Sequence, residues 1–257
     1  GVLRRASPAA HPQVTSSAPP AGVLRGSRVA VVGAGRMGHA LVAAVPGWLG
    51  PFGRGFDGAL PDGAIADVVV LAVPDGEIAR AAAAIQPGPL VGHTAGALGL
   101  DVLVPPERFA VHPLMAVPRT GADLRGAGAA VAGSTPRACA LAFEMARLLG
   151  MEPFEIADAD RAAYHASASI ASNFLVTLED AAATLLATTG ADRQLPGPLV
   201  RAALEHGGPA ALTGPIARGD EATVQRQRAA VAERTPELLA MFDEMCARTR
   251  ALADRRQ

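Results

Sequence analysis

The stretch RVAVVGAGRMGHALVAAV constrains the fold more than any other part of the sequence. A β-rich apolar run, Val29 to Val32, leads into the glycines Gly33, Gly35 and Gly38, and a helical pattern follows. The first glycine permits a tight turn, the second lets a pyrophosphate approach the backbone, and the third lets helix pack on strand. This order predicts a strand, a GxGxxG turn and a helix that bind a dinucleotide. The alternative is a glycine-rich turn without a nucleotide.

The rest of the first half alternates strands with helices. Strands are expected in ADVVVLAVP, PLVGHT, RFAVHP, GAAVAG and EPFEI. Helices are expected in DGEIARAAAAI, with Asp75 as the N-cap, in the short LGLDVL, and in TPRACALAFEMARLLG, which Gly150 closes. Strand–helix alternation with continuous apolar strands predicts an α/β, parallel, doubly wound sheet of the Rossmann type.

From about residue 153 the pattern becomes helical. One long helix is expected in ADADRAAYHASASIASNFLVTLEDAAATLLATTG and a shorter one in LPGPLVRAALEHGG. TGPIARGD is expected to be a loop, Asp220 to cap the helix EATVQRQRAAVAE, and Pro236 to start the last helix. The sequence therefore predicts three parts, namely a disordered lead-in (1–25), a dinucleotide-binding Rossmann domain (26–152) and an all-helical substrate and dimerisation domain (153–257).

Charge and composition exclude several function classes. A formal net charge of −1 argues against a nucleic-acid or anionic-membrane surface, and no apolar run reaches transmembrane length. Cys139 and Cys246 lie far apart without a CxxC pattern, which fits a reducing cytoplasm. All 23 basic residues are arginine. A Schiff base and a lysine acid are thus excluded, and proton transfer near neutral pH falls first to histidine. No metal is expected.

The segment after the first helix, PGWLGPFGRGFDGALPDG, departs from the dinucleotide-binding pattern. A second strand that ends in Asp or Glu is expected there for an NAD ribose, but only a short glycine-rich piece is present. Asp57 is a poor candidate for that acid. Arg54 is a candidate partner for a 2′-phosphate, which favours NADP over NAD, although a surface-loop role fits Arg54 equally well.

Polar residues stand at two predicted strand ends. Ligands of a doubly wound sheet lie outside the carboxyl ends of its strands, where His93 and Thr94 close PLVGHT and His112 closes RFAVHP. Alternation sends His93 and Thr94 to opposite faces. His112 is followed by Pro113, so it either points into the crevice or bonds a nearby carbonyl. His93 is expected to be structural, whereas Thr94 is a candidate substrate contact.

Two further candidate groups lie in the helical half. His165, Ser169 and Asn173 are spaced four residues apart and would share one face of an α-helix. Burying such groups is costly unless they are paired, so a wet cleft is favoured over an interhelical network or a subunit contact. Arg218, in LTGPIARGDEATV, either clamps a substrate carboxylate or pairs with an acid beside the helix cap Asp220.

Several motifs together resemble a known family. They are GAGRMG, AVPDGEI, GHTAGALGL, HPLMAV, YHASASIASNFLVTLE and LTGPIARGDEATV, in that order. They resemble bacterial Rossmann-type oxidoreductases with a helical C-terminal domain of unknown function, from about residue 27 to the end. That family is similar to ketopantoate reductase, pyrroline-carboxylate reductase, prephenate dehydrogenase and the phosphogluconate dehydrogenase group.

The resemblance implies roles for individual residues. In ketopantoate reductase and related β-hydroxyacid dehydrogenases, a lysine proton donor precedes an asparagine by four residues; Asn173 matches the asparagine and Ser169 stands where the lysine would be. His165, one turn away, is then a candidate donor. HPLMAV resembles the HPxAG motif of prephenate dehydrogenase, which implies a catalytic His112 with Thr94 as its hydroxyl partner. The acid stays open between His112 and His165.

These inferences predict an NADP-dependent reductase, with NAD possible, that transfers hydride to a small 2-oxo acid such as ketopantoate. The alternatives are an imine reductase of the pyrroline-carboxylate type, a prephenate or arogenate dehydrogenase, and a non-catalytic dinucleotide sensor or scaffold. A cytoplasmic homodimer through the helical domain is expected, as the resemblance implies. The predicted cofactor contacts are Gly33, Gly35, Arg36, Met37, Gly38, Arg54, Val73, Pro74 and Asp75.

Overall fold

The structure, a computed structural model, describes residues 22–118 and 122–255 of the chain. It contains two compact units, one that ends at Ala166 and one that runs from Ser167 to the C-terminus. The predicted lead-in, residues 1–25, lies outside the described residues apart from residues 22–25. His165 therefore belongs to the first unit, and Ser169 and Asn173 belong to the second.

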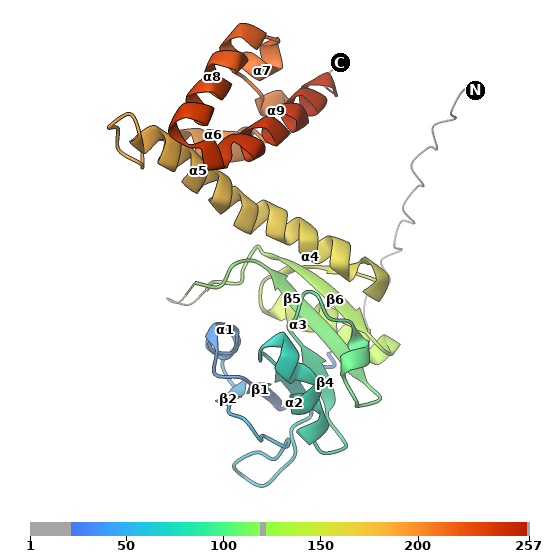
Figure 1. The fold of residues 1–257 in the computed structure, drawn as a ribbon. Helices are drawn as coiled ribbons and strands as arrows, with labels where there is room; N and C mark the ends of the chain where they lie inside the picture. The colour runs from blue at the N-terminus through green and yellow to red at the C-terminus, as the bar shows by residue number, and fades with distance from the viewer. Residues whose placement is uncertain (1–21, 119–121, 256–257) are drawn as a thin grey trace, which may run out of the picture. The chain divides into compact units, whose positions relative to one another are not determined.

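The first unit is built on one sheet with the strand order β2-β1-β3-β4-β5-β6-β7 (Figure 1). The bounds are β1 Val29–Val32, β2 Leu49–Phe52, β3 Val68–Leu71, β4 Leu90–His93, β5 Arg108–Leu114, β6 Gly128–Gly133 and β7 Glu152–Glu155. Strands β1 to β5 are parallel, whereas β6 is antiparallel to β5, and β7 is parallel to β6. Among the described residues between β5 and β6 none is helical, whereas a parallel pair is typically joined by a helical crossover. The predicted fold class is confirmed, with two strands reversed.

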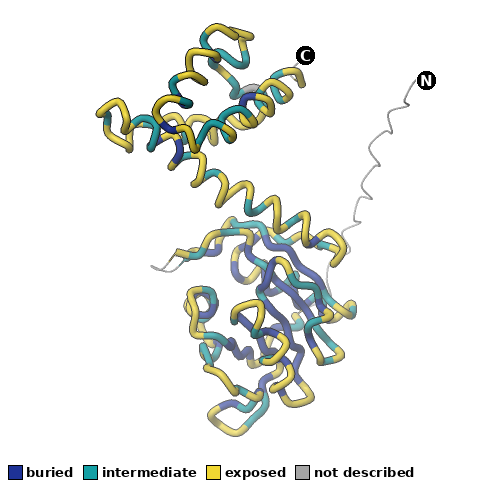
Figure 2. The backbone as a smooth tube through the Cα atoms, in the orientation of Figure 1, coloured by how far each residue is buried: buried dark blue, intermediate teal, exposed yellow. Residues whose placement is uncertain are grey.

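Helices pack on both faces of the sheet, and the burial pattern of β1 records this. Val29 and Val31 share a core cluster with residues of α1 (Arg36–Ala44) and α3 (Pro136–Leu148), such as Leu41. Ala30 and Val32 belong to a second cluster, which includes residues of α2 (Ile78–Ala84). Successive side chains of a strand point to opposite faces, so a wholly buried strand must be apolar throughout. Figure 2 shows the buried strands in dark blue.

Two local expectations for this unit are wrong. The segment that looked too rich in glycine does form a strand, β2, which pairs with β1 through Ala30 and Leu49. Its end is fixed by a 2.8 Å hydrogen bond from the Gly33 amide to the Phe52 carbonyl. Asp75 is not an N-cap, because it begins the short 3-10 helix η1 (Asp75–Glu77) and its side chain makes no capping bond. The expected LGLDVL helix is the 3-10 helix η2 (Leu100–Val102).

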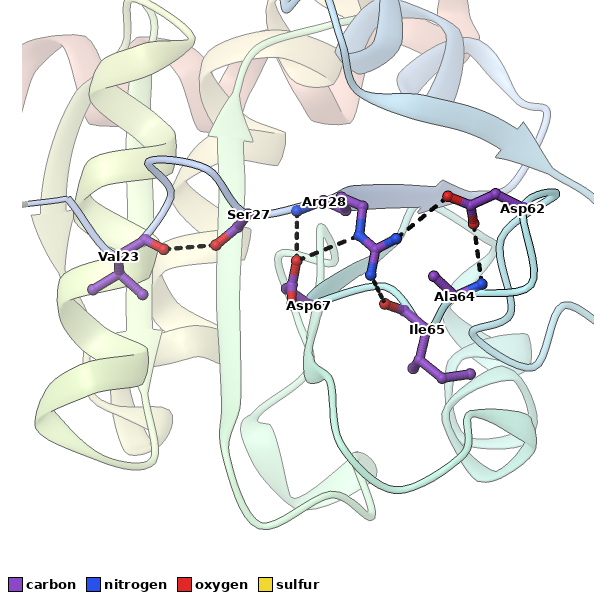
Figure 3. Close-up of polar contacts among 7 residues, drawn as sticks. All are labelled: Val23, Ser27, Arg28, Asp62, Ala64, Ile65 and Asp67. Atoms are coloured by element: carbon purple, nitrogen blue, oxygen red, sulfur yellow. Dashed lines mark hydrogen bonds and ion pairs between the residues drawn. The ribbon is translucent and has the colours of Figure 1, made fainter.

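Arg28 ties the start of β1 to the segment that leads into β3 (Figure 3). Its amide donates to Asp67 Oδ2 at 2.7 Å, and its guanidinium donates to the Ile65 carbonyl at 3.1 Å and contacts Asp62 Oδ2 at 3.5 Å. Asp62 in turn accepts a bond from the Ala64 amide at 3.0 Å. These contacts lie at the amino end of β1, opposite the glycine turn. These contacts stabilise the amino end of β1. The carboxyl end of the strand, next to the glycine turn, is not involved in them.

The long predicted helix is interrupted by a π-helical segment. It runs as η3 (Asp158–Asp160), α4 (Arg161–Ser169), the π-helix η4 (Ile170–Phe174) and α5 (Leu175–Ala187). Asn173 lies in the π segment, so the α-helical spacing of four holds from His165 to Ser169 but not from Ser169 to Asn173. Such π segments occur frequently at functional sites.

The helical run Asp158–Ala187 also corrects the expectation about membrane-length segments. It has 30 residues, and its most apolar 18-residue window has a mean hydropathy of 1.3 and is 11% buried. By length and composition alone this helix can cross a membrane. The sequence-based expectation considered only uninterrupted apolar runs and so passed over a helix in which small and polar residues separate the apolar ones.

The remaining helices of the second unit are α6 (Gly197–His206), α7 (Pro215–Arg218), α8 (Glu221–Arg234) and α9 (Leu239–Asp254), with the 3-10 turns η5 (Pro209–Ala211) and η6 (Pro236–Leu238). The predicted cap of α8 is confirmed, since Asp220 accepts a hydrogen bond from the Thr223 amide at 3.1 Å. Pro236 opens the last helical segment, as predicted. The expected loop TGPIARGD instead contains the one-turn helix α7, which begins at Pro215.

Candidate active site

The three glycines of the turn each satisfy a different geometric demand. Gly33 has φ +113°, and a Cβ on it would collide with the Ala72 carbonyl. A Cβ on Gly38 would collide with the Gly33 carbonyl, whereas one on Gly35 would meet nothing within 4 Å. Gly35 also precedes α1 without a side-chain cap. The amides of the first turn of α1 are therefore open to an anion, as a pyrophosphate site requires.

A cavity of about 420 Å³ lies on one side of this turn. Most of its lining is small or apolar, including Phe56, whose ring stacks on Phe52 with the centroids 4.2 Å apart. Its charged side chains are Arg54, in the loop after β2, and Glu77 and Arg80, which form an ion pair beside α2. Its residues are Val32, Gly33, Ala34, Gly35, Gly53, Arg54, Gly55, Phe56, Ala72, Val73, Pro74, Glu77, Arg80, Ala81 and Ala84.

A second cavity, of about 580 Å³, lies on the other side of the turn. It shares four residues with the first cavity and adds five, as a site for one long ligand would. Arg36 lines it and donates a hydrogen bond from Nη1 to the Val117 carbonyl at 2.9 Å. Its residues are Gly35, Arg36, Met37, Ala72, Val73, Pro74, Ala116, Val117 and Pro118.

The two cavities contain most of the predicted cofactor contacts. Gly33, Gly35, Arg36, Met37, Arg54, Val73 and Pro74 line one or both of them. Gly38 is buried and packs under the turn, where its role is steric. Asp75 is exposed and stands in η1, outside the lining of both cavities.

A cluster of polar side chains lies at the carboxyl end of β4 and β5, the edge of the sheet that carries the glycine turn. His112, on β5, contacts the hydroxyl of Tyr164 through Nδ1 at 2.7 Å. The rings of His112 and His165 are 6.3 Å apart at 70°. A Cβ on Gly96 would lie 2.8 Å from His112 Nε2 and 2.9 Å from His165 Cδ2. Glycine at position 96 thus lets both imidazoles approach the chain after β4.

His93, the last residue of β4, is a buried member of the cluster. It is fully buried, accepts a bond from the Ala95 amide at Nδ1 (3.2 Å) and contacts the Gly99 carbonyl through Nε2 (3.1 Å). These partners place the proton on Nε2 and leave the ring neutral. Burial lowers the pKa of His93, and the nearby charge of Arg161 lowers it further. Both ring nitrogens of His93 are bonded to the backbone, as expected of a structural histidine.

Arg161 places a buried positive charge in this cluster. Its side chain is 1% exposed and its Nε donates to Asp158 Oδ1 at 2.9 Å. Both terminal nitrogens, Nη1 and Nη2, are buried without a hydrogen-bond partner. Burial alone would raise the pKa of Asp158, but the bonds from Arg161 and the Leu100 amide hold it below its usual value. A guanidinium with two unpaired donors is costly to bury, so it favours an anion nearby.

The surroundings of His112 keep its imidazole neutral. Burial lowers its pKa to about 4, and His165, Arg161 and His93 each contribute through like-charge repulsion. At neutral pH His112 therefore offers one N–H donor and one acceptor nitrogen. Burial also raises the pKa of Tyr164, while Arg161 opposes that effect. His112 can polarise or protonate a substrate oxygen only as a neutral donor.

The other predicted site residues are placed as follows. Thr94 is half-buried, and its amide donates to the Leu71 carbonyl at 3.2 Å. In the second unit, Ser169 is half-buried and Asn173 is exposed; Ser172 Oγ donates to Asn173 Oδ1 at 3.5 Å. Arg218 is exposed at the end of α7, and its charge helps to lower the pKa of Asp220. Across the described residues, no group of three or more His, Cys, Asp or Glu is placed to hold a metal.

Sequence reasoning missed three residues that the structure brings to these sites, namely Arg80, Tyr164 and Arg161. Arg80 follows Glu77 by three residues, and Arg161 follows Asp158 by three, which are ion-pair spacings on a helix. Tyr164 is the single tyrosine of the chain and adjoins His165. These signals were visible, but only the fold brings Tyr164 to His112 and Arg80 to the turn.

Comparison with known proteins supports the fold. Residues 128–249 match the model of Domain of unknown function (DUF2520). Protein TM1727 from Thermotoga maritima superposes with a TM-score of 0.74 at 19% identity, over 89% of this chain and 99% of that one. A Bacteroides fragilis protein assigned to the NADP oxidoreductases gives 0.70 at 18% identity, over 88% and 98%. A reductive aminase from Aspergillus terreus, in complex with NADPH and ethyl levulinate, gives 0.61 at 15% identity, over 90% and 99%.

No curated protein matches the chain. The superpositions cover both the sheet and the helices that follow it, and most of the family match falls on those helices. The predicted resemblance is therefore confirmed as a Rossmann-type fold in which residues 128–249 match the DUF2520 model.

Proposed function

We propose that the chain is an NADP-dependent reductase that transfers a hydride to the carbonyl carbon of a small 2-oxo acid, of the ketopantoate type. The open approach at Gly35 and the cavities on both sides of the turn support a dinucleotide. The neutral His112 beside the same sheet edge supports proton transfer to oxygen. The structural similarity to NADP oxidoreductases and to a reductive aminase agrees with this class.

The observation that carries the choice of a carbonyl is that the two terminal nitrogens of Arg161, Nη1 and Nη2, are buried without a hydrogen-bond partner. Hydride addition to C=O places negative charge on oxygen, and a buried positive charge near that oxygen lowers the barrier. Reduction of C=N acts on an iminium that is already cationic, which the same charge opposes. Because Arg161 has two buried donors without partners and its charge acts on His112, the cluster favours an oxyanion.

The residues around the glycine turn would bind the cofactor, and those of the His112 cluster would contact the substrate. A bound NADPH supplies the hydride. The amides at the start of α1 would hold its pyrophosphate, and Arg36 would close that side through its bond to Val117. His112 would donate its N–H to the substrate oxygen, and Thr94 remains a candidate contact that orients the substrate. The ring of His165 would border the cluster, with its centroid 6.3 Å from that of His112.

Arg54 and Arg80 support NADP rather than NAD. Both line the first cavity, one from the loop after β2 and the other from α2. A 2′-phosphate carries about two negative charges and binds guanidinium groups through charge-assisted hydrogen bonds. Arg80 forms an ion pair with Glu77, which competes with a phosphate for its guanidinium. The loop after β2 carries an arginine at Arg54 where NAD-specific proteins place an acid.

An imine reductase is the second candidate, because one structural neighbour is named a reductive aminase. The experiment that separates the two measures NADPH oxidation with a panel of 2-oxo acids and a panel of cyclic imines. We expect turnover of an oxo acid, and Arg161→Gln should reduce its kcat/KM by about 100-fold or more. Arg161→Lys, which keeps the charge, should retain more activity, and both variants should bind NADPH as the wild type does.

Other outcomes would overturn the proposal. If imines react faster than oxo acids and Arg161→Gln leaves or improves that rate, the chain is an imine reductase. If NADPH binds but no compound of either panel reacts, the chain is a dinucleotide sensor or scaffold.

The proposed assembly is a homodimer through the second unit, in the cytoplasm. Helix α6 has no buried residue, and Leu199 and Leu204 are 75% and 63% exposed. Ile170, Phe174 and Val176 of η4 and α5 are also more than half exposed. Exposed apolar side chains mark a protein or membrane contact where they gather in one patch. Glu179 and Asp180 lie within the long apolar helix, and two acids there are costly in lipid, which favours a protein partner.

A further inference from the structure

Tyr164 is held between two aromatic partners of the first unit. Its hydroxyl lies 2.7 Å from His112 Nδ1, and the two rings meet edge-on with centroids 5.5 Å apart. Phe154 of β7 packs against Tyr164 with centroids 5.8 Å apart and planes at 69°. The tyrosine ring is therefore confined on both sides, and its hydroxyl is aimed at one nitrogen of His112.

The direction of this hydrogen bond fixes the tautomer of His112. The imidazole is neutral, because it is half-buried and is surrounded by His93 on β4 and by Arg161 and His165 on α4. A neutral imidazole has one acceptor nitrogen, and a phenol hydroxyl is a stronger acid than the N–H of a neutral imidazole. The favoured arrangement is therefore O–H···Nδ1, which leaves the proton of His112 on Nε2.

Nε2 is the ring nitrogen that Tyr164 leaves unoccupied. A Cβ on Gly96 would lie 2.8 Å from Nε2, which is too close for a side chain, so glycine is what lets the ring approach the chain after β4. Tyr164 thus occupies the Nδ1 edge of the ring, and the proposed function places the substrate oxygen at the Nε2 edge.

We propose that Tyr164 is the positioning residue of a His112–Tyr164 proton relay, an inference that rests on the proposed function. As hydride reaches the carbonyl carbon, the C–O π electrons move to oxygen, the Nε2–H bond of His112 breaks and an O–H bond forms. Nδ1 takes the proton from the Tyr164 hydroxyl in the same step, so the imidazole stays neutral. The phenolate left behind then takes a proton from water.

The two Nη donors of Arg161 have a place in this relay. Burial raises the pKa of Tyr164, and the positive charge of Arg161 lowers it and so offsets part of that effect. Both Nη atoms are buried and have no hydrogen-bond partner, whereas Nε is paired with Asp158. The relay would therefore pass negative charge from the substrate oxygen towards the guanidinium of Arg161.

The test separates the relay from the proposed function. In the cofactor-free protein, ¹⁵N NMR of labelled histidine reports the tautomer of each ring, and His112→Asn assigns the signal. We expect His112 to be protonated at Nε2 in the wild type and in Phe154→Leu, and to become a tautomer mixture in Tyr164→Phe. Phe154→Leu is the matched control because it loosens the same ring while it keeps the hydroxyl.

Kinetics with the oxo acid complete the test. Tyr164→Phe should lower kcat by about 100-fold or more with little change in KM, as loss of proton transfer does. An unchanged tautomer in Tyr164→Phe would overturn the relay whatever the turnover. A fixed tautomer that needs the hydroxyl, with no wild-type turnover of any oxo acid, would support the positioning by Tyr164 and overturn the proposed function.

Discussion

Nη1 of Arg36 donates a hydrogen bond to the carbonyl oxygen of Val117 at 2.9 Å, which ties the glycine turn to the segment after β5. Arg36 and Val117 both line the second cavity, so this bond joins two parts of its lining. We predict that Arg36→Ala raises the Kd of NADPH and of NADH alike, each by about tenfold, because a pyrophosphate contact does not depend on the 2′-phosphate. A fluorescence titration with both cofactors measures this, and a loss for one cofactor alone would refute the assignment.

Arg54→Ala and Arg80→Ala should act differently. Each should raise the Kd of NADPH by about tenfold and leave that of NADH unchanged, because only NADPH carries the phosphate. Glu77→Gln should tighten NADPH, since it frees Arg80 from the ion pair. Arg36→Ala serves as the control that affects both cofactors. Equal losses of NADH and NADPH binding in the Arg54 and Arg80 variants would remove the argument for NADP.

Gly35 and Gly38 form a matched pair for separating binding from folding. Gly35→Ala has an ordinary φ of −84° and meets nothing within 4 Å, so the free energy of unfolding should hardly change. It should nevertheless weaken both dinucleotides, because the new methyl occupies the approach of the pyrophosphate. Gly38→Ala collides with the Gly33 carbonyl and should cost about 1–3 kcal/mol of stability. Thermal melts and cofactor titrations distinguish the two effects.

Most of the first unit follows from its sequence because local patterns decide it. Val29–Val32 is apolar at every position and is buried on both faces, as a central parallel strand must be. β2 was harder to foresee, since Gly50 and Pro51 disfavour a strand and only pairing with β1 makes one. The reversal of β6 likewise depends on the connection before it rather than on its own residues.

The candidate site was only partly visible, because its partners come from different elements. His112 and His165 were candidates on their motifs, but nothing in the sequence joins His112 to Tyr164 across 52 positions. Arg161 resembles a surface helix residue until the fold buries it. Asn173 was placed by α-helical spacing, which the π segment alters. A sequence shows which residue types can carry chemistry, but it does not show which of them interact electrostatically across different elements.

The lowered pKa of His112 predicts how stability depends on pH. Its value of about 4 in the folded chain lies below the ordinary 6.5, so the unfolded chain binds the proton first as the solution is acidified. The stabilisation is therefore complete above about pH 6.5 and is lost as the pH falls towards 4. The loss should be on the order of 3 kcal/mol. Unfolding in urea at a series of pH values measures it.

His112→Gln isolates this contribution. The variant should lose part of the slope between pH 6.5 and 4, while His93, whose pKa is also lowered by burial, should keep the remainder. An identical slope in wild type and His112→Gln would mean that His112 titrates normally in the folded chain. The argument for a neutral His112 at the sheet edge would then fail.

The exposed apolar face of α6 gives the last prediction. If a second copy of the chain covers it, Leu199→Glu combined with Leu204→Glu should convert a dimer into a monomer in sedimentation equilibrium, because two buried carboxylates are strongly unfavourable. Val104→Glu, at a site 72% exposed in the first unit, should leave the dimer intact. A wild-type monomer that pellets with phospholipid vesicles would instead assign this face, together with the apolar helix Asp158–Ala187, to a membrane surface.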